Sequence, residues 1–124
     1  MLPQDFQYTR SHEWVKEDGE CFIAGITFFA QEQLGDITFV ELPEVGKLVD
    51  QGDEMAVVES VKAASEIYAP ISGEIIAVNT DLEDTPELIN EDPFGKGWII
   101  RIKSSATVSN LLSADEYAQL IQGD

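Results

Sequence analysis

The fold of this chain is constrained most by its short apolar runs, each of which stops within a few residues at glycine, proline, asparagine or aspartate. Residues 37–42 alternate in the manner of a half-buried strand until Pro43 stops the run. Four later runs have the apolar content of strands, at 55–58, 67–71, 74–78 and 98–103. Short strands separated by turn residues are typical of antiparallel sandwiches and barrels. The sequence therefore predicts a mainly β fold, a sandwich or flattened barrel.

A weak internal repeat supports two similar β halves. The segments 42–46 and 69–73 share the order apolar, proline, two residues and glycine, and each is followed three residues later by an apolar residue, Val49 or Ile76. Proline and glycine occur at turns throughout all-β proteins for ordinary steric reasons, so two similar turn sequences alone do not establish a repeat. The repeat is supporting evidence only.

Helix signals are few. Thr27 is a suitable N-cap for a helix through Leu34, and Gly35 supplies a left-handed stop. Thr85–Pro86 has a favourable cap and first residue for another helical turn. Ser113–Glu116 has the pattern of a capping box at the start of a C-terminal helix. We expect that helix to pack on the β core through one face, formed by Tyr117, Leu120 and Ile121.

Length and charge limit the classes of partner. A chain of 124 residues fits a single domain, residues 1–124, and its hydrophobic fraction of 44% is typical of a globular protein. The 24 acidic and 7 basic residues give a net charge of −17, which repels phosphate backbones and anionic lipid. We therefore expect no nucleic acid or membrane partner, a monomeric state, and transient protein partners with basic rims around their active sites.

The single cysteine, Cys21, excludes an intramolecular disulfide and is compatible with a reducing compartment. The sequence has no signal peptide pattern and no run of transmembrane length, so we expect a bacterial-type cytoplasmic protein, or a mitochondrial matrix protein if the chain is a processed organellar form. We expect Cys21 to be a small core residue, and Trp14 and Trp98 to be core or cleft-wall residues.

Catalytic and metal-binding constellations are weak. His12 and Cys21 lack an orienting group and an oxyanion hole, which argues against a nucleophile and base pair. One histidine and one cysteine are too few for a zinc site. The acidic run 81–87 lacks the spacing and central glycine of a calcium loop, and we expect it to form a solvated face.

Lys62 has an unusual setting, because no other basic residue occurs between Lys47 and Lys96. It lies between one strand that should end near Val61 and another that should begin near 66–67, at the tip of a hairpin. The residues between these strands are small, Ala63, Ala64 and Ser65. Such a turn presents an accessible ammonium group in a fixed position, as a modification site requires. Position alone favours the alternative, an ordinary solvated lysine.

The residues around Lys62 resemble the attachment hairpin of lipoyl and biotinyl carrier domains, in which a lysine at a turn carries the cofactor as an amide. The matching positions are Gly52–Asp53, Glu59, Lys62–Ala63, Glu66–Ile67, Pro70 and Gly73. Biotin carriers typically place methionines on both sides of the lysine, whereas Val61 and Ala63 flank it here. The resemblance is therefore to the lipoyl branch.

A wider set of segments carries a more specific resemblance. These segments are Ser11–Trp14, Gly25–Thr27, Ala30–Glu32, Leu34–Asp36, Leu42–Gly46, Glu59–Ala63, Pro86–Asn90 and Gly97–Trp98. Together, from about Tyr8 to Tyr117, they resemble the H proteins of the glycine cleavage system. The resemblance implies a single lipoyl-type flattened barrel or sandwich, with short helices, a C-terminal helix, and family-specific extensions at both ends. It implies lipoate on Lys62 and no catalysis by the chain itself.

The resemblance also implies the partners. The lipoyl group on Lys62 would accept an aminomethyl group from glycine at a pyridoxal-phosphate glycine decarboxylase. A tetrahydrofolate-dependent aminomethyltransferase would then take the one-carbon unit, and dihydrolipoyl dehydrogenase would reoxidise the dithiol. A lipoylating enzyme, either a lipoate ligase or an octanoyltransferase, would first modify the lysine.

Five further residues are candidates for roles around the cofactor. The loaded group carries a cationic amine and is prone to attack by water, so it benefits from a dry cleft with a carboxylate. The resemblance implies docking near Ser11, Glu13 and Glu66, although Glu66 is one methylene longer than the aspartate common there. Solvated side chains are the alternative. Glu59 would serve recognition by the lipoylating enzyme or else pair across the hairpin, and Gly73 would aid recognition or simply allow a tight strand approach.

Three rival functions remain open. A biotin carrier is disfavoured by Val61 and Ala63. A lipoyl relay protein that donates lipoate to other enzymes and an interaction-only paralogue that is never modified both fit the same sequence.

Overall fold

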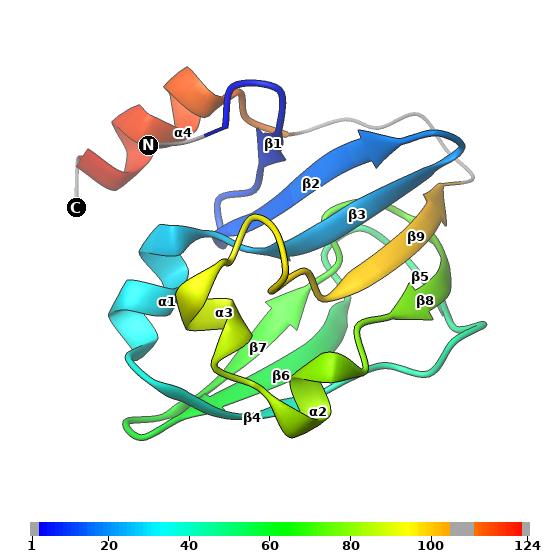
Figure 1. Ribbon diagram of the computed structural model, residues 1–124. Coiled ribbons are helices and arrows are strands. Elements are labelled where there is room, and N and C mark those ends of the chain that lie inside the picture. Colours follow the sequence, from blue (N-terminus) through cyan, green and yellow to red (C-terminus); the bar gives the residue numbers. More distant parts are fainter. Residues whose placement is uncertain (1–2, 105–110, 123–124) are drawn as a thin grey trace.

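Two antiparallel sheets form a sandwich in the computed structural model, which describes residues 3–104 and 111–122. The larger sheet has six strands in the order β1-β2-β3-β9-β8-β5, and the smaller has three in the order β4-β6-β7 (Figure 1). The strands of the larger sheet are Gln7–Tyr8 (β1), Glu13–Asp18 (β2), Cys21–Ile26 (β3), Leu48–Val49 (β5), Gly73–Val78 (β8) and Ile100–Ser104 (β9). Those of the smaller sheet are Ile37–Glu41 (β4), Glu54–Ser60 (β6) and Ala64–Tyr68 (β7).

The expected mainly β sandwich with short helices and a C-terminal helix is confirmed. Strands β4, β6, β7, β8 and β9 overlap the runs that the sequence predicts. The sequence pattern alone does not predict β1, β2, β3 or β5. The dipeptide Asp18–Gly19 is a sequence signal for the hairpin of β2 and β3. The hairpin closes through a two-residue loop, in which Gly19 takes φ 67°. The two segments of the weak repeat lead into β5 and β8, which pair with each other.

The main core lies between the two sheets. Inward-facing side chains of the smaller sheet include Val40, Val58 and Ile67, and those of the larger sheet include Ile75 and Ile102, which are paired across β8 and β9. All five are at most 3% exposed. Each fully buried residue of this kind contributes about 1.5–3 kcal/mol to stability.

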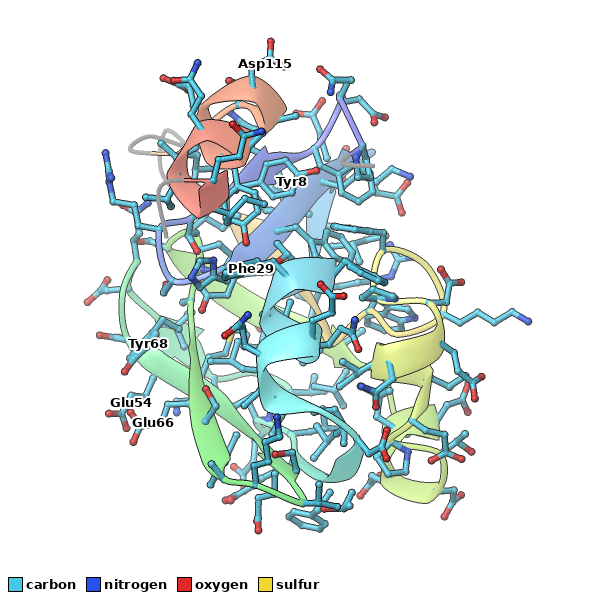
Figure 2. The ribbon with its side chains drawn as sticks, turned by 90° about the vertical axis from the view of Figure 1, so that its left-hand side faces the viewer. Tyr8, Phe29, Glu54, Glu66, Tyr68 and Asp115 are labelled. Carbon is cyan, nitrogen blue, oxygen red and sulfur yellow. The ribbon has the colours of Figure 1, made fainter. Side chains whose placement is uncertain are left out.

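A second, aromatic cluster lies under the C-terminal helix, α4 (Ala114–Gln122). Trp14 is buried there as expected, and its Nε1 donates to the carbonyl of Pro93 at 2.9 Å. Trp98 is partly buried against the same cluster. Tyr8, labelled in Figure 2 beneath α4, stacks on Tyr117 with ring centroids 4.9 Å apart. A Cβ on Gly25 would lie 2.9 Å from the Trp14 ring, so glycine is needed for the indole to pack on β3.

Two of the three predicted helix starts are confirmed. Thr27 Oγ1 accepts from the amide of Ala30 at the start of α1 (Phe28–Leu34), and Gly35 ends that helix with φ 83°. The capping box precedes α4, because Ser113 Oγ accepts from the amide of Glu116 and the Glu116 carboxylate accepts from the amide of Ser113. The predicted face of α4 is confirmed too: Tyr117 is buried, and Leu120 and Ile121 pack on the aromatic cluster.

The expected turn at Thr85–Pro86 is present, because the amide of Leu88 donates to the carbonyl of Thr85 at 3.1 Å, but Thr85 is not the N-cap of an α-helix. Thr85 ends α2 (Asp81–Asp84), since its amide donates to the carbonyl of Asp81. Pro86 does begin a turn, because the amide of Ile89 donates to its carbonyl, but the next helix, α3 (Leu88–Glu91), has Glu87 at its N-cap position. The acidic run of α2 is solvated as expected, with only Leu82 of that helix buried. No helix among the described residues is long and apolar enough to cross a membrane.

Candidate functional site

Lys62 lies exposed in the turn between β6 and β7, as predicted. The turn is tighter than expected, because β6 ends at Ser60 and β7 begins at Ala64. Ser60 closes it: its amide donates to the carbonyl of Ala63 at 2.8 Å, and its Oγ accepts from the amides of Lys62 at 3.1 Å and Ala63 at 3.2 Å. Figure 1 shows the turn at the end of the sandwich, next to the segment that joins α1 to β4.

The stem of Lys62 lies beside the end of α1. A Cβ on Gly35 would be 3.6 Å from Cε of Lys62, an ordinary van der Waals distance, so the stem of the lysine passes close to the end of α1. The amide of Val61 also donates to the carbonyl of Asp36 at 3.3 Å. The turn is therefore supported from outside its own hairpin, which the sequence pattern does not reveal.

Asn90 fixes the segment on which the turn rests. Its Oδ1 accepts from the amide of Ile37, and its Nδ2 donates to the carbonyl of Gly35 and to Oε1 of Gln31, all at 2.8–2.9 Å. One amide side chain on α3 thus ties α1 to β4. The segment Pro86–Asn90 contains this residue, but its sequence gives no sign of partners more than fifty positions away.

Ser11 and Glu13 come together at the start of β2, where Ser11 is exposed and Glu13 is buried. Glu13 is 2% exposed, and its Oε1 accepts from Ser11 Oγ at 2.6 Å and from Thr9 Oγ1 at 2.5 Å. Its Oε2 accepts from the amide of Tyr68 at 3.4 Å. Burial raises the pKa of Glu13, and the hydrogen bonds from Ser11 and Thr9 offset part of that rise. A solvated Glu13 is therefore excluded.

Glu66 does not contact Glu13 directly. It lies on the exposed face of β7 and accepts from the hydroxyl of Tyr68 at 3.1 Å. Figure 2 shows Glu54, Glu66 and Tyr68 gathered on this face, and the hydrogen bond and charge of Glu66 raise the pKa of Glu54. Tyr68 links the carboxylates, through its amide to Glu13 and its hydroxyl to Glu66. The strand period puts 66 and 68 on one face, so Tyr68 was detectable from the sequence.

Glu59 and Gly73 lie in different sheets. Glu59 is exposed near the end of β6, with Phe39 and Ala64 as its cross-strand neighbours, neither of which is a cation. A Cβ on Gly73 would lie 2.2 Å from the carbonyl oxygen of Lys103. Glycine at this position is therefore required by the close approach of β8 to β9, and any effect on recognition would act through the fold.

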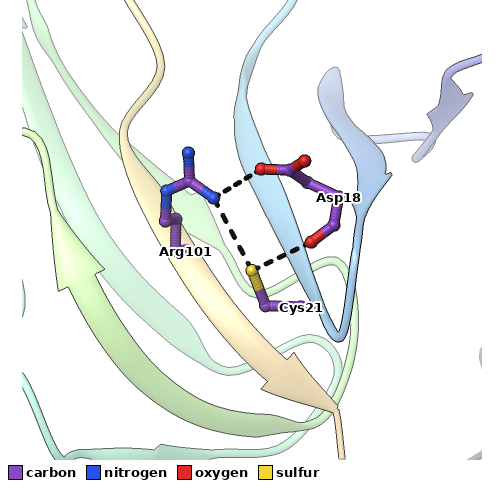
Figure 3. A network of polar contacts seen from close by, with 3 residues as sticks. All are labelled: Asp18, Cys21 and Arg101. Atoms are coloured by element: carbon purple, nitrogen blue, oxygen red, sulfur yellow. Dashed lines mark hydrogen bonds and ion pairs between the residues drawn. The ribbon is translucent and has the colours of Figure 1, made fainter.

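Cys21 is not a core residue, contrary to expectation. It is partly exposed beside the turn of the β2 and β3 hairpin, beyond the edge of the core. Its Sγ donates to the carbonyl of Asp18 at 3.3 Å and lies 3.6 Å from Nη1 of Arg101, which also forms an ion pair with Asp18 at 2.6 Å (Figure 3). His12 precedes the opposite end of this hairpin, so the two residues are about 16 Å or more apart along it and form no dyad. Among the described residues, no group of three or more potential ligands could hold a metal ion.

Comparisons with known proteins place the chain in one family. The family model described as glycine cleavage H-protein matches residues 6–124. Glycine cleavage system H proteins of Pseudoalteromonas translucida and Thermus thermophilus are 57% and 50% identical to the chain, and each alignment covers 99% of the chain and 98% of the relative. A crystal structure of a glycine cleavage system H protein from Mycobacterium marinum is 42% identical, with a TM-score of 0.92 over 98% of this chain and 99% of that one. The expected architecture is thereby confirmed, and the chain belongs to the family of glycine cleavage H proteins.

Proposed function

We propose that this protein is the lipoyl carrier of a glycine cleavage system and that Lys62 carries the lipoyl group as an amide. The observation that carries the proposal is the exposed Lys62 in a turn held by Ser60, within a chain of this family. The site fits the group, because Lys62 is exposed and the two residues that follow it, Ala63 and Ala64, are small and exposed. When bound, the lipoyl group supplies a disulfide that accepts the aminomethyl unit of glycine as carbon dioxide is lost.

The chain itself contributes presentation and shelter, and it catalyses nothing. Three enzymes would act on the cargo in turn: a pyridoxal-phosphate glycine decarboxylase, a tetrahydrofolate-dependent aminomethyltransferase and dihydrolipoyl dehydrogenase. The net charge of −17 suits brief encounters with enzymes that have basic rims. The matched relatives named above are bacterial, and we place the protein in the cytoplasm.

Ser11, Glu13 and Glu66 would receive the loaded group. Lys62 and Tyr68 are six positions apart on one hairpin, at most about 20 Å of extended chain. A modified Lys62 that folds back along β7 passes Glu66 before it approaches Glu13. The buried carboxylate of Glu13, with its two hydroxyl donors, would attract the cationic amine and keep water from it. An approaching cation would favour the ionised form of Glu13.

Glu59 would orient the lipoylating enzyme, a lipoate ligase or an octanoyltransferase. Its carboxylate is exposed three positions before Lys62 and has no cation opposite it in the sheet register. A fixed charge beside the target lysine suits a complementary basic site.

The test is the intact mass, with peptide mapping, of the protein produced in cells supplied with both lipoate and biotin, beside a Lys62→Arg control. We expect a lipoyl increment on Lys62 that is absent from the control. The modified protein should then undergo reduction that depends on glycine and the decarboxylase. A biotin increment would overturn the assignment in favour of a biotin carrier. Lipoylation without glycine-dependent reduction would favour a lipoyl relay protein, and no modification by a competent lipoylating enzyme would favour an interaction-only paralogue.

A further inference from the structure

One side chain of the C-terminal helix, that of Tyr117, contacts the segment that holds Ser11 and Glu13, two of the residues proposed to receive the loaded group. Tyr117 on α4 is fully buried, and its hydroxyl lies 2.7 Å from Nδ1 of His12 and 2.7 Å from Oγ1 of Thr27. Figure 1 shows α4 beside β1, which pairs with β2. The segment that joins these two strands, together with Glu13 at the start of β2 (residues 9–13), is called the docking loop here. The hydroxyl of Tyr117 thus contacts the residue that separates Ser11 from Glu13.

His12 has an unusual backbone. Its φ of 74° is the only positive value for a residue other than glycine in the described part of the chain. A left-handed conformation of this kind costs about 1–3 kcal/mol and persists only where the surroundings impose it. Here the imidazole contacts the rings of Phe29 and Tyr117, and the carbonyl of His12 accepts from the amide of Thr27 at 3.0 Å.

This backbone conformation shapes the docking loop. The amide of His12 donates to the carbonyl of Thr9, and the amide of Glu13 donates to Thr9 Oγ1. In an extended strand, residues 11 and 13 would lie on one face about 7 Å apart. The turn that ends at His12 instead brings Ser11 Oγ to 2.6 Å from the Glu13 carboxylate. If His12 relaxed to an extended conformation, Ser11 Oγ would lose its position on the Glu13 carboxylate.

We propose that Tyr117 is a positioning residue, whose hydroxyl holds His12 and thereby keeps Ser11 and Glu13 arranged to receive the cationic amine of the aminomethyl cargo. This inference rests on the proposed carrier function. It assigns the C-terminal helix a part in protecting the cargo, in addition to covering the aromatic cluster.

The chain offers a matched pair of variants. Tyr117→Phe removes the hydroxyl and keeps the ring that stacks on Tyr8. Tyr8→Phe removes another buried hydroxyl from the same cluster, one that donates to the carbonyl of Pro3 at 2.7 Å and contacts no residue of the docking loop in the hydrogen bonds observed. A general loss of packing would affect both variants, whereas a loss of positioning would affect only Tyr117→Phe.

The first experiment uses the lipoylated protein. Wild type and both variants are loaded from labelled glycine by the decarboxylase, separated from it, and followed for release of the labelled one-carbon unit into buffer. We expect Tyr117→Phe to lose the label at least about threefold faster than wild type, the effect of one hydrogen bond, and Tyr8→Phe to match wild type. Equal release from Tyr117→Phe and wild type would overturn the proposal.

A second readout separates this proposal from the carrier function. Amide hydrogen exchange of the unmodified protein reports the loop directly, through the amides of Glu13 and Thr27. Both should exchange faster in Tyr117→Phe and not in Tyr8→Phe. Unchanged exchange would overturn the role of Tyr117 even if loading succeeds. Failure of wild type to load would contradict the carrier function, whatever the exchange data show for the loop.

Discussion

The turn that presents Lys62 depends on the side chain of Ser60. Its Oγ accepts from two successive amides of the turn, those of Lys62 and Ala63. We expect Ser60→Ala to slow lipoylation by roughly threefold or more, because a looser turn must be ordered by the modifying enzyme. Water can replace the lost acceptor at this exposed site, so the free energy of unfolding should fall by no more than about 1 kcal/mol.

The rate of lipoyl transfer to the unmodified protein, followed by mass spectrometry, checks this prediction. Thr38→Ala is the matched control, since Thr38 Oγ1 donates to the carbonyl of Glu59 in the same sheet but takes no part in the turn. Equal rates for Ser60→Ala and Thr38→Ala would contradict it.

Glu13 gives the molecule a defined dependence on pH. Burial raises its pKa above the ordinary 4.5, so the folded state binds this proton more tightly than the unfolded state does. The stability that protonated Glu13 confers is therefore complete below about pH 4.5 and is lost as pH rises through the raised folded-state pKa. Glu13→Gln removes the titration. The stability of wild type relative to this variant should thus decline as pH rises above about 4.5 and through the raised folded-state pKa of Glu13.

Urea unfolding at a series of pH values measures that difference. Glu17→Gln, a change at an exposed carboxylate on the same strand, is the control for the loss of one negative charge. A stability difference between wild type and Glu13→Gln that does not vary with pH would show that Glu13 titrates normally in the folded protein.

For helices and strands, the sequence predicts those features that depend on residues close together in the chain. The cap at Thr27, the stop at Gly35 and the capping box at Ser113–Glu116 each involve residues within a few positions, and all three are present. The burial of Glu13 is not predictable in this way, because one of its partners is the amide of Tyr68, 55 positions away. The turn at Lys62 was predictable, but its support by the carbonyl of Asp36 was not.

Gly73 illustrates the difference between a recognition residue and a residue that the sheet requires. Gly73→Ala would place a Cβ 2.2 Å from the carbonyl oxygen of Lys103. That oxygen belongs to the backbone of β9, which cannot shift without disturbing its pairing with β8. We expect it to destabilise the fold by about 2 kcal/mol or more, with lipoylation falling only as the folded fraction falls. Denaturant unfolding beside lipoylation yield checks this, with the exposed neighbour Glu74→Ala as control. A fully stable Gly73→Ala protein with impaired lipoylation would establish direct recognition instead.

A substitution of Glu59 should have the opposite effects, with stability kept and lipoylation slowed. Its side chain is exposed, so Glu59→Gln should leave the free energy of unfolding within about 0.5 kcal/mol of wild type. If Glu59 orients the modifying enzyme as proposed, the rate of lipoylation should nevertheless fall, because the orienting charge is lost. Steady-state lipoylation kinetics would report this as a lower kcat/KM. An unchanged kcat/KM would leave Glu59 as an ordinary surface residue.

The whole molecule combines a two-sheet sandwich with a net charge of −17. A carrier must bind several enzymes and dissociate from each of them. Long-range electrostatic attraction suits this task, because it raises the association rate more than it raises the lifetime of the complex. The charge is spread over both sheets and the helices, so no single carboxylate should account for it. Its effect should therefore appear in the response to salt.

We expect kcat/KM for loading of the lipoylated protein by the decarboxylase to fall by roughly tenfold between 10 mM and 150 mM salt, as the Debye length shrinks from about 30 Å to about 8 Å. The limiting rate at saturating carrier should change little, because salt acts on the encounter and not on the bound complex. Release of the cargo from the isolated loaded protein involves no encounter with another protein, and its rate is the internal control. A kcat/KM that is insensitive to salt would mean that short-range contacts around Lys62, rather than the charge of the whole molecule, govern how the carrier finds its partners.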